Sequence, residues 1–175
     1  MKLHLGCGER DFGTDWIHID QAEYDHIVHK SVTELLFADE SCDLIYASHL
    51  FEYFSRDEGA QVIKEWRRCL KPGGVLRLAV PDFEVMCNLY KNGYSLDMFL
   101  GPLYGKMGSP SFYHKTVYDF FSLKSFLKSS GFRSVSRYDW RETEHADFDD
   151  HSQAYIPHMD KEHGILLSLN VEAVK

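Results

Sequence analysis

The sequence has little that would serve membrane insertion, disulfide formation or nucleic-acid binding. Its four cysteines are widely spaced and form no CxxC pair, so reduced thiols in a cytosolic protein are the simplest interpretation. No apolar run approaches the roughly 18–20 residues that span a bilayer, and only Met1 and Lys2 precede the first strand-like stretch, which leaves no room for a signal peptide. The net charge of −8 disfavours a general nucleic-acid binder, because phosphate contacts need clustered Lys and Arg. We therefore expect a cytoplasmic protein with no nucleic-acid or membrane partner.

What the sequence does have is enough apolar surface for a folded core. Apolar residues make up 44% and aromatic residues 14% of 175 residues, which favours one globular domain spanning 1–175. Two regions give no clear periodicity, and we expect an irregular insert at about 81–111 and a polar loop at about 140–164.

Along the rest of the chain, strand-like and helix-like patterns alternate. The apolar spacing predicts helices over 55–70 and 122–130, the first opened by the capping box Ser55-Arg-Asp-Glu58. A second capping box, from Ser31 to Glu34, predicts a short helix or turn. Strands are predicted at 2–5, 16–19, 27–29, 43–47, 75–80, 132–139 and 165–173. Interleaved strands and helices favour an α/β doubly wound sheet.

The opening stretch places Gly6-Cys7-Gly8 after the first strand and Asp20 after the second. In such sheets ligands bind beyond the carboxyl ends of central strands, glycines let the backbone approach them, and a carboxylate can accept bonds from both ribose hydroxyls. The pattern indicates a nucleoside-bearing cofactor, although an ordinary loop explains the glycines equally well. A dinucleotide fold is disfavoured, because Asp11 occupies the third glycine position and Asp20 lies only twelve residues beyond Gly8.

Longer motifs carry a more specific resemblance. LHLGCG, WIHID, LLFADESCDLIYASHLFEYF and EWRRCLKPGGVLRLAVPDF resemble successive motifs of class I S-adenosylmethionine-dependent methyltransferases, and more narrowly a small bacterial group of predicted methyltransferases associated with surface-glycan gene neighbourhoods. The resemblance covers about residues 2–84, and the segments GFRSVSRYDW and ILLSLNVEAVK are similar to the family's last two strands. It implies a Rossmann-like, mostly parallel seven-stranded sheet, with the last strand antiparallel and inserted between its neighbours.

The resemblance also implies site residues for S-adenosylmethionine. Gly6, Cys7 and Gly8 would pass beneath the methionine moiety, and Asp20 would bind the ribose diol, its alternative role being an N-cap with Glu23 three residues later. Ser31 and Val32 would lie near the adenine, although the capping box alone could explain Ser31. Ala47, Ser48 and His49 would close the fourth strand near the sulfonium.

The chain departs from the family pattern in three places. His4 stands where many relatives carry the acid that binds the cofactor's amino group. The loop between the first two strands is short enough to replace the usual first helix. The N-terminal helix is missing, which predicts that one face of the sheet is thinly covered or is covered by a second subunit in a homodimer.

A hydroxyl acceptor would need a general base, and three residues are candidates. His49 is the first choice because of its place after the fourth strand, with helix capping as the alternative. His114 lies where an acceptor loop would form, or is an ordinary polar loop residue. Asp82 follows the fifth strand, or only initiates a turn. Glu52 would sit one turn beyond His49, or face solvent.

The segment from Glu142 to His151 mixes carboxylates with histidines. Its spacing matches no metal-ligand motif, so we predict no metal site and favour a solvated loop or a lid.

We expect a cytoplasmic methyltransferase that acts on a small molecule or glycan precursor, most plausibly at oxygen. The alternative is a cofactor-binding accessory or sensor module without catalysis. A sugar- or nucleotide-handling enzyme on the same sheet is disfavoured, because Gly6-Cys7-Gly8 is too short to cradle a phosphate.

Overall fold

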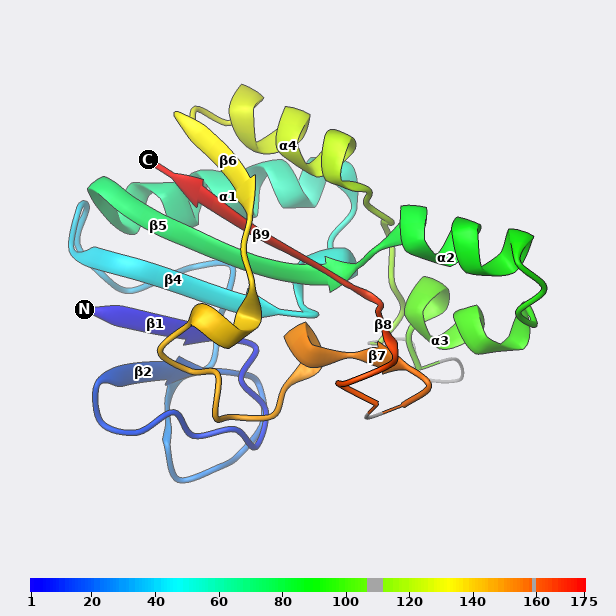
Figure 1. Cartoon of the computed structure of the whole chain (residues 1–175). Coiled ribbons are helices and arrows are strands. Elements are labelled where there is room, and N and C mark those ends of the chain that lie inside the picture. Colours follow the sequence, from blue (N-terminus) through cyan, green and yellow to red (C-terminus); the bar gives the residue numbers. More distant parts are fainter. Residues whose placement is uncertain (107–111, 159) are drawn as a thin grey trace.

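The computed structural model describes residues 1–106, 112–158 and 160–175, and a seven-stranded sheet forms its centre. The strands lie in the order β3-β2-β1-β4-β5-β9-β6 (Figure 1). They span β1 (Lys2–Leu5), β2 (Trp16–Ile19), β3 (Ile27–His29), β4 (Cys42–Ser48), β5 (Leu70–Pro81), β6 (Ser134–Arg137) and β9 (Ser168–Val174). All neighbours pair in parallel except β9, which runs antiparallel to both β5 and β6. The expected methyltransferase-like sheet, with its last strand antiparallel and inserted between neighbours, is confirmed.

The sheet winds in two directions from its middle. The chain moves from β1 outward to β2 and β3, then returns to place β4 on the other side of β1. The carboxyl ends of β1 and β4 therefore lie side by side at the point where the strand order reverses, which is where open α/β sheets bind ligands.

Two helices cover one face of the sheet. α1 (Arg56–Cys69) begins at the predicted capping box, in which the Ser55 amide donates to Glu58 at 2.7 Å, and it buries Val62, Ile63 and Trp66. α4 (Phe120–Ser129) lies beside it (Figure 1). This helix starts two residues before the predicted position, because Asp119 caps it and accepts a bond from the Ser122 amide at 2.7 Å.

The other face is covered by the chain itself. Residues 140–153, which include the 3-10 helices η2 (Trp140–Glu142) and η3 (His151–Gln153), lie against it. His145 packs on Tyr46 of β4 with ring centroids 4.2 Å apart, and Arg77 of β5 pairs with Glu144 at 2.7 Å. The predicted solvated loop is therefore only partly correct: His145 is 1% and Asp150 5% exposed, whereas Glu142, Asp147 and Asp149 are exposed.

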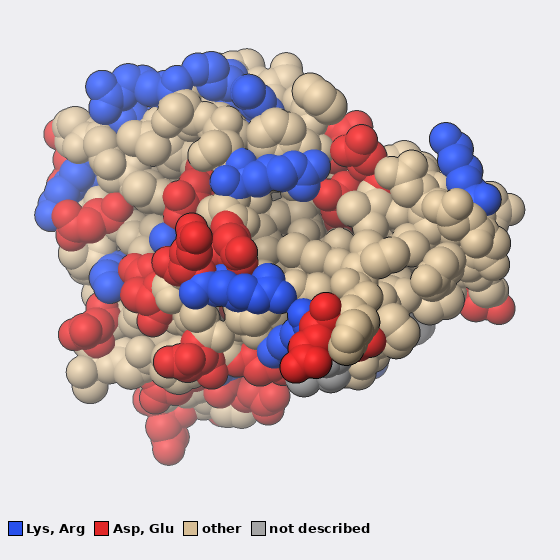
Figure 2. Space-filling model, viewed as in Figure 1, with Lys and Arg blue, Asp and Glu red and all other residues tan. Residues whose placement is uncertain are grey.

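The insert at 81–111 forms two helices in its described part. α2 (Phe83–Lys91) and α3 (Asp97–Tyr104) project beyond the carboxyl edge of the sheet (Figure 1). Met86 and Leu89 pack on Phe99 and on Leu167, a contact between distant segments that local periodicity cannot register. The face of this lobe that Figure 2 shows carries few charges. Residues 107–111 of the insert lie outside the described residues.

Two strand predictions need correction. β5 begins at Leu70 rather than at residue 75, because the turn after α1 already pairs with β4 through Leu70 and Cys42. The predicted final strand is divided at Leu167, whose amide turns away to donate to Ala154 at 2.8 Å. Its first part, β8 (Ile165–Leu166), pairs with β7 (Tyr155–Ile156) in a separate small sheet.

In the described ranges, no helix is both long and apolar enough to cross a bilayer.

Candidate active site

A cavity of about 1300 Å³ opens at the carboxyl ends of the central strands. Its walls come from the loops after β1, β2, β3 and β4, from residues 112, 113 and 115, and from Asp150 and His151. The predicted cofactor residues Gly6, Cys7, Gly8, Asp20, Ser31, Val32 and Ser48 all line it. The topology thus collects, in one cavity, residues from four separate segments of the sequence.

The glycine turn forms the floor of this cavity in a conformation that needs glycine. Gly6 and Gly8 have φ angles of 65° and 56°, a region that residues with a Cβ rarely adopt. A Cβ at Gly6 would also lie 3.0 Å from the side chain of Leu50. Cys7 between them is buried, and burial raises the pKa of its thiol to about 12, so it is a packing residue rather than a nucleophile.

Asp20 holds the glycine turn and keeps acceptor capacity free. One carboxylate oxygen accepts the Gly8 amide and the other accepts the Ala22 amide, both at 2.8 Å. A carboxylate has about four lone-pair sites, so each oxygen retains one toward the cavity that Asp20 lines. The alternative role as a helix N-cap is wrong, because the residues after Asp20 form bends and a turn rather than a helix.

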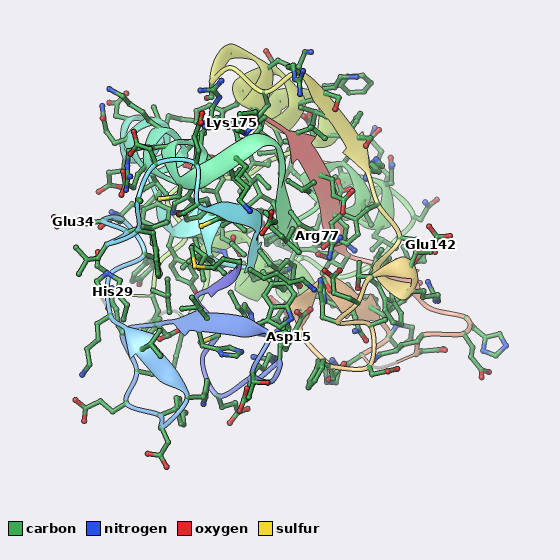
Figure 3. The ribbon with its side chains drawn as sticks, turned by 90° about the vertical axis from the view of Figure 1, so that its left-hand side faces the viewer. Asp15, His29, Glu34, Arg77, Glu142 and Lys175 are labelled. Atoms are coloured by element: carbon green, nitrogen blue, oxygen red, sulfur yellow. The ribbon has the colours of Figure 1, made fainter. Side chains whose placement is uncertain are left out.

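Ser31 and Val32 are held at the cavity by the turn after β3. The Ser31 hydroxyl accepts the Glu34 amide at 3.0 Å, and the His29 ring bonds the Glu34 carbonyl at 2.8 Å, at the end of β3 (Figure 3). The capping box thus makes a turn with no helix after it. Val32 is buried, and its carbonyl accepts the Trp66 indole N–H at 2.7 Å.

At the end of β4 the structure brings Ser48, but not Ala47, to the cavity wall. Ala47 is fully buried in the core on the helix-covered face. The Ser48 hydroxyl has no hydrogen-bond partner among the described residues, so it is available to a ligand.

His4 replaces the acid of the family pattern with a neutral ring. It lines the cavity, is 1% exposed and stacks on Phe12 with centroids 4.0 Å apart. Burial, followed by the charge of His18, holds the pKa of His4 well below its ordinary value. Its Nδ1 has no partner in the described ranges, and a neutral nitrogen there can accept a hydrogen bond from an ammonium group.

His49 lies at the cavity wall in a strained backbone conformation, with φ at 48°. Its Nε2 is 3.2 Å from the Ser168 hydroxyl, and its Nδ1 is 3.5 Å from Glu52 Oε1. Burial, then His151 and His114, hold the pKa of His49 well below its ordinary value, so the ring is neutral at pH 7. The capping alternative is wrong, because the N-cap of the following 3-10 helix η1 (Phe51–Tyr53) is Leu50, and no side chain caps it.

Glu52 and His114 lie together behind the cavity wall. Glu52 is 1% exposed, so the alternative that it faces solvent is wrong. His114 Nε2 is 3.9 Å from Glu52 Oε1, and the His114 Nδ1 bonds the Pro102 carbonyl at 2.9 Å. Burial raises the pKa of Glu52 to about 8 and lowers that of His114.

Asp82 is not among the residues that line the cavity. Its side chain accepts the Glu84 and Val85 amides at the start of α2 and pairs with Arg137 at 3.1 Å. The structure therefore assigns Asp82 to helix capping.

Arg10 and His151 are among the cavity residues that sequence reasoning did not assign to the site. Arg10 donates through Nε to the Asp149 carbonyl at 2.8 Å, and this bond ties the glycine turn to the 140–153 segment. His151 lies with its ring centroid 5.2 Å from that of His49. Neither contact has a sequence signal, because the partners are over 100 residues apart.

Within the described ranges, no group of three or more His, Cys, Asp or Glu side chains could hold a metal ion.

Comparison with known proteins agrees with this geometry. Residues 11–78 match the model of a methyltransferase domain, and no curated protein matches the sequence. The structure is similar to a SAM-dependent methyltransferase from Archaeoglobus fulgidus, with a TM-score of 0.62 and 18% identity over 99% of this chain and 85% of that one. A possible histamine N-methyltransferase from Thermotoga maritima gives a TM-score of 0.62 at 16% identity, over 99% of this chain and 81% of that one.

A third similar structure contains a bound product cofactor. It is the 1,6-didemethyltoxoflavin-N1-methyltransferase of Burkholderia thailandensis with 1,6-didemethyltoxoflavin and S-adenosylhomocysteine, with a TM-score of 0.60 and 13% identity over 99% of this chain and 70% of that one. Residues 11–78 therefore match a methyltransferase domain, and the whole chain has the fold of these solved methyltransferases.

Proposed function

We propose that the protein transfers the methyl group of S-adenosylmethionine to a hydroxyl oxygen of a small molecule or glycan precursor. The observation that carries the choice of oxygen is the neutral imidazole of His49 at the cavity wall. A hydroxyl is protonated at neutral pH, and general-base catalysis is what such an acceptor requires.

The residues on the cofactor side fit S-adenosylmethionine. Gly6 and Gly8 leave the backbone open to the methionine moiety, and Asp20 offers one free lone-pair site on each oxygen to the ribose hydroxyls. Ser31 and Val32 would border the adenine, and Ser48 would lie near the sulfonium. When bound, the cofactor supplies a methyl group that is already activated, so the protein has to hold an acceptor in line and remove its proton.

His49 is suited to remove that proton. The Ser168 hydroxyl donates to Asn170 Oδ1 at 2.9 Å, so it can only accept from the His49 Nε2–H. The Nδ1 lone pair of His49 is then free, and no described residue hydrogen bonds to it. In this assignment His114 and Asp82 do not touch the acceptor.

Turnover and binding measurements test the proposal together. Titration of the purified protein with S-adenosylmethionine should give saturable heat, and incubation with methyl-labelled cofactor should label a hydroxylated member of a panel of sugar nucleotides and metabolites. The same acceptor with its hydroxyl removed should stay unlabelled. Absence of binding at millimolar cofactor, or labelling only at nitrogen or sulfur, would contradict the proposal.

The second candidate is a cofactor-binding module without catalysis, favoured by the neutral His4 in place of an acid. Release of S-adenosylhomocysteine with any acceptor would exclude it. We further propose a reducing, cytoplasmic setting, because all four cysteines are free.

A further inference from the structure

Glu52 is the least satisfied buried acid of the described residues. It is 1% exposed, and neither carboxyl oxygen has a hydrogen-bond partner in the described part of the chain. An ionised carboxylate in such surroundings would be strongly destabilising unless it were paired. No Lys or Arg of the described residues pairs with it: Arg56, the nearest in sequence, donates to the Val117 carbonyl at 3.3 Å, and Lys115 pairs with Glu58 at 2.9 Å.

The first imidazole near Glu52, that of His49, offers its carboxyl group no hydrogen. Asn170 donates to the Ser152 carbonyl and accepts from Ser168, which fixes Ser168 as an acceptor from the His49 Nε2–H. The His49 Nδ1, 3.5 Å from Glu52 Oε1, is therefore the unprotonated nitrogen.

The second imidazole, that of His114, likewise offers the Glu52 carboxyl group no hydrogen. The His114 Nδ1 must donate to the Pro102 carbonyl, which leaves Nε2, 3.9 Å from the same Glu52 oxygen, unprotonated. Neither nitrogen carries a hydrogen that it could donate to Glu52, so an ionised carboxylate there would be buried without a partner. The arrangement therefore requires Glu52 to be neutral.

The remaining neighbours of Glu52 do not stabilise its ionised form. The amides of Lys115 and Thr116 donate to its backbone carbonyl, not to its carboxyl group. Tyr53 and Tyr118 are other nearby titratable groups; burial, with a smaller contribution from Glu52, raises the pKa of both, which keeps them neutral.

We propose that His49, Glu52 and His114 act as one proton-accepting unit, in which Glu52 is the positioning residue that couples the cavity-wall histidine to the buried one. This inference rests on the proposed transfer to a hydroxyl. As the acceptor O–H bond breaks, its proton forms a bond with His49 Nδ1, and the Glu52 proton moves to His114 Nε2. A carboxylate then lies between two imidazolium rings, and the unit gains one positive charge, equal to the sulfonium charge lost on methyl transfer.

The protonation states can be measured without an acceptor. In protein labelled with ¹⁵N-histidine and ¹³C-glutamate, NMR should show neutral His49 and His114 in the Nε2–H and Nδ1–H tautomers, and a Glu52 carboxyl that is protonated at pH 7 and titrates near pH 8. A Glu52 carboxyl already ionised at pH 6, or the Nδ1–H tautomer at His49, would overturn the proposal.

Kinetics distinguish coupling from a merely structural role. Glu52→Gln keeps the side-chain volume and a hydrogen-bond donor, but the glutamine side chain cannot ionise. It should lower kcat roughly 10²-fold and leave the affinity for S-adenosylhomocysteine unchanged. It should also remove the rise in kcat that we expect of the wild type between pH 7 and pH 9. Glu142→Gln, an exposed change on η2 (Figure 3), is the matched control and should keep the wild-type profile.

His114→Gln gives a second, opposite signature. It removes the group that receives the Glu52 proton, so kcat should fall at pH 7 and recover at pH 9, where Glu52 is already ionised. An equal loss at both pH values, or a Glu52→Gln profile that still rises, would overturn the inference while turnover itself upheld the proposed function. If no acceptor is methylated at all, the proposed function fails.

Discussion

Replacement of Asp20 by alanine tests the cofactor site at the residue on which it depends most. Each Asp20 oxygen already accepts one backbone amide and retains one lone-pair site toward the cavity. A hydrogen bond to a charged group contributes about 1.5–3 kcal/mol, and about 1.4 kcal/mol corresponds to a tenfold change in affinity. We therefore expect Asp20→Ala to weaken S-adenosylhomocysteine binding by roughly 10- to 150-fold.

Calorimetric titration measures this change, and two comparisons show whether it comes from the ribose. Asp25 is an exposed acid in the same loop, and it does not line the cavity. The Asp25→Ala variant should therefore bind S-adenosylhomocysteine as the wild type does. An analogue without the two ribose hydroxyls should bind wild type and Asp20→Ala equally, as a double-mutant cycle requires for a direct contact. Equal affinities of the Asp20 and Asp25 variants for S-adenosylhomocysteine would refute the assignment, provided that circular dichroism shows both folded.

Three further changes have defined outcomes. His49→Gln should lower kcat roughly 10²–10⁴-fold while calorimetry shows unchanged S-adenosylhomocysteine affinity; a kcat near that of the wild type would remove His49 as the base. Gly6→Ala should destabilise the protein by about 1–3 kcal/mol in urea unfolding, because the φ of 65° and the Leu50 contact at 3.0 Å both oppose a Cβ; unchanged stability would show that the turn relaxes. The Glu52 pKa is raised from 4.5 to about 8, so its contribution to stability is complete below pH 4.5 and is lost as pH rises to 8, at about 1.4 kcal/mol per pH unit. Glu52→Gln should therefore match the wild type near pH 4 and exceed its unfolding free energy at pH 8; the reverse order would contradict a neutral Glu52.

The elements that depend on local pattern could be predicted from the sequence. The short strands around the glycine turn, the capped helix α1 and the antiparallel last strand all follow from apolar spacing, caps and family motifs. Asp20 and the glycines line the cavity because they directly follow strands whose order the family motifs define; their role in cofactor binding stays a prediction.

What the sequence could not supply depends on contacts between distant segments. Glu52 has no local feature that distinguishes it from an exposed acid, and its burial arises because residues 114–116 fold over it. His145 and Asp150 read as part of an acidic loop, yet Asp150 accepts the Tyr46 hydroxyl at 2.5 Å from 104 residues away. The helices α2 and α3 were obscured because Gly93 and Pro102 interrupt their pattern, whereas their packing on Leu167 stabilises them.

A crystal structure of the complex with S-adenosylhomocysteine tests the central claim most directly. The account predicts the nucleoside across the glycine turn, with both ribose hydroxyls within hydrogen-bonding distance of the Asp20 carboxylate and the vacant methyl position facing His49. A ribose bound elsewhere, with Asp20 engaged only by the Gly8 and Ala22 amides, would contradict it.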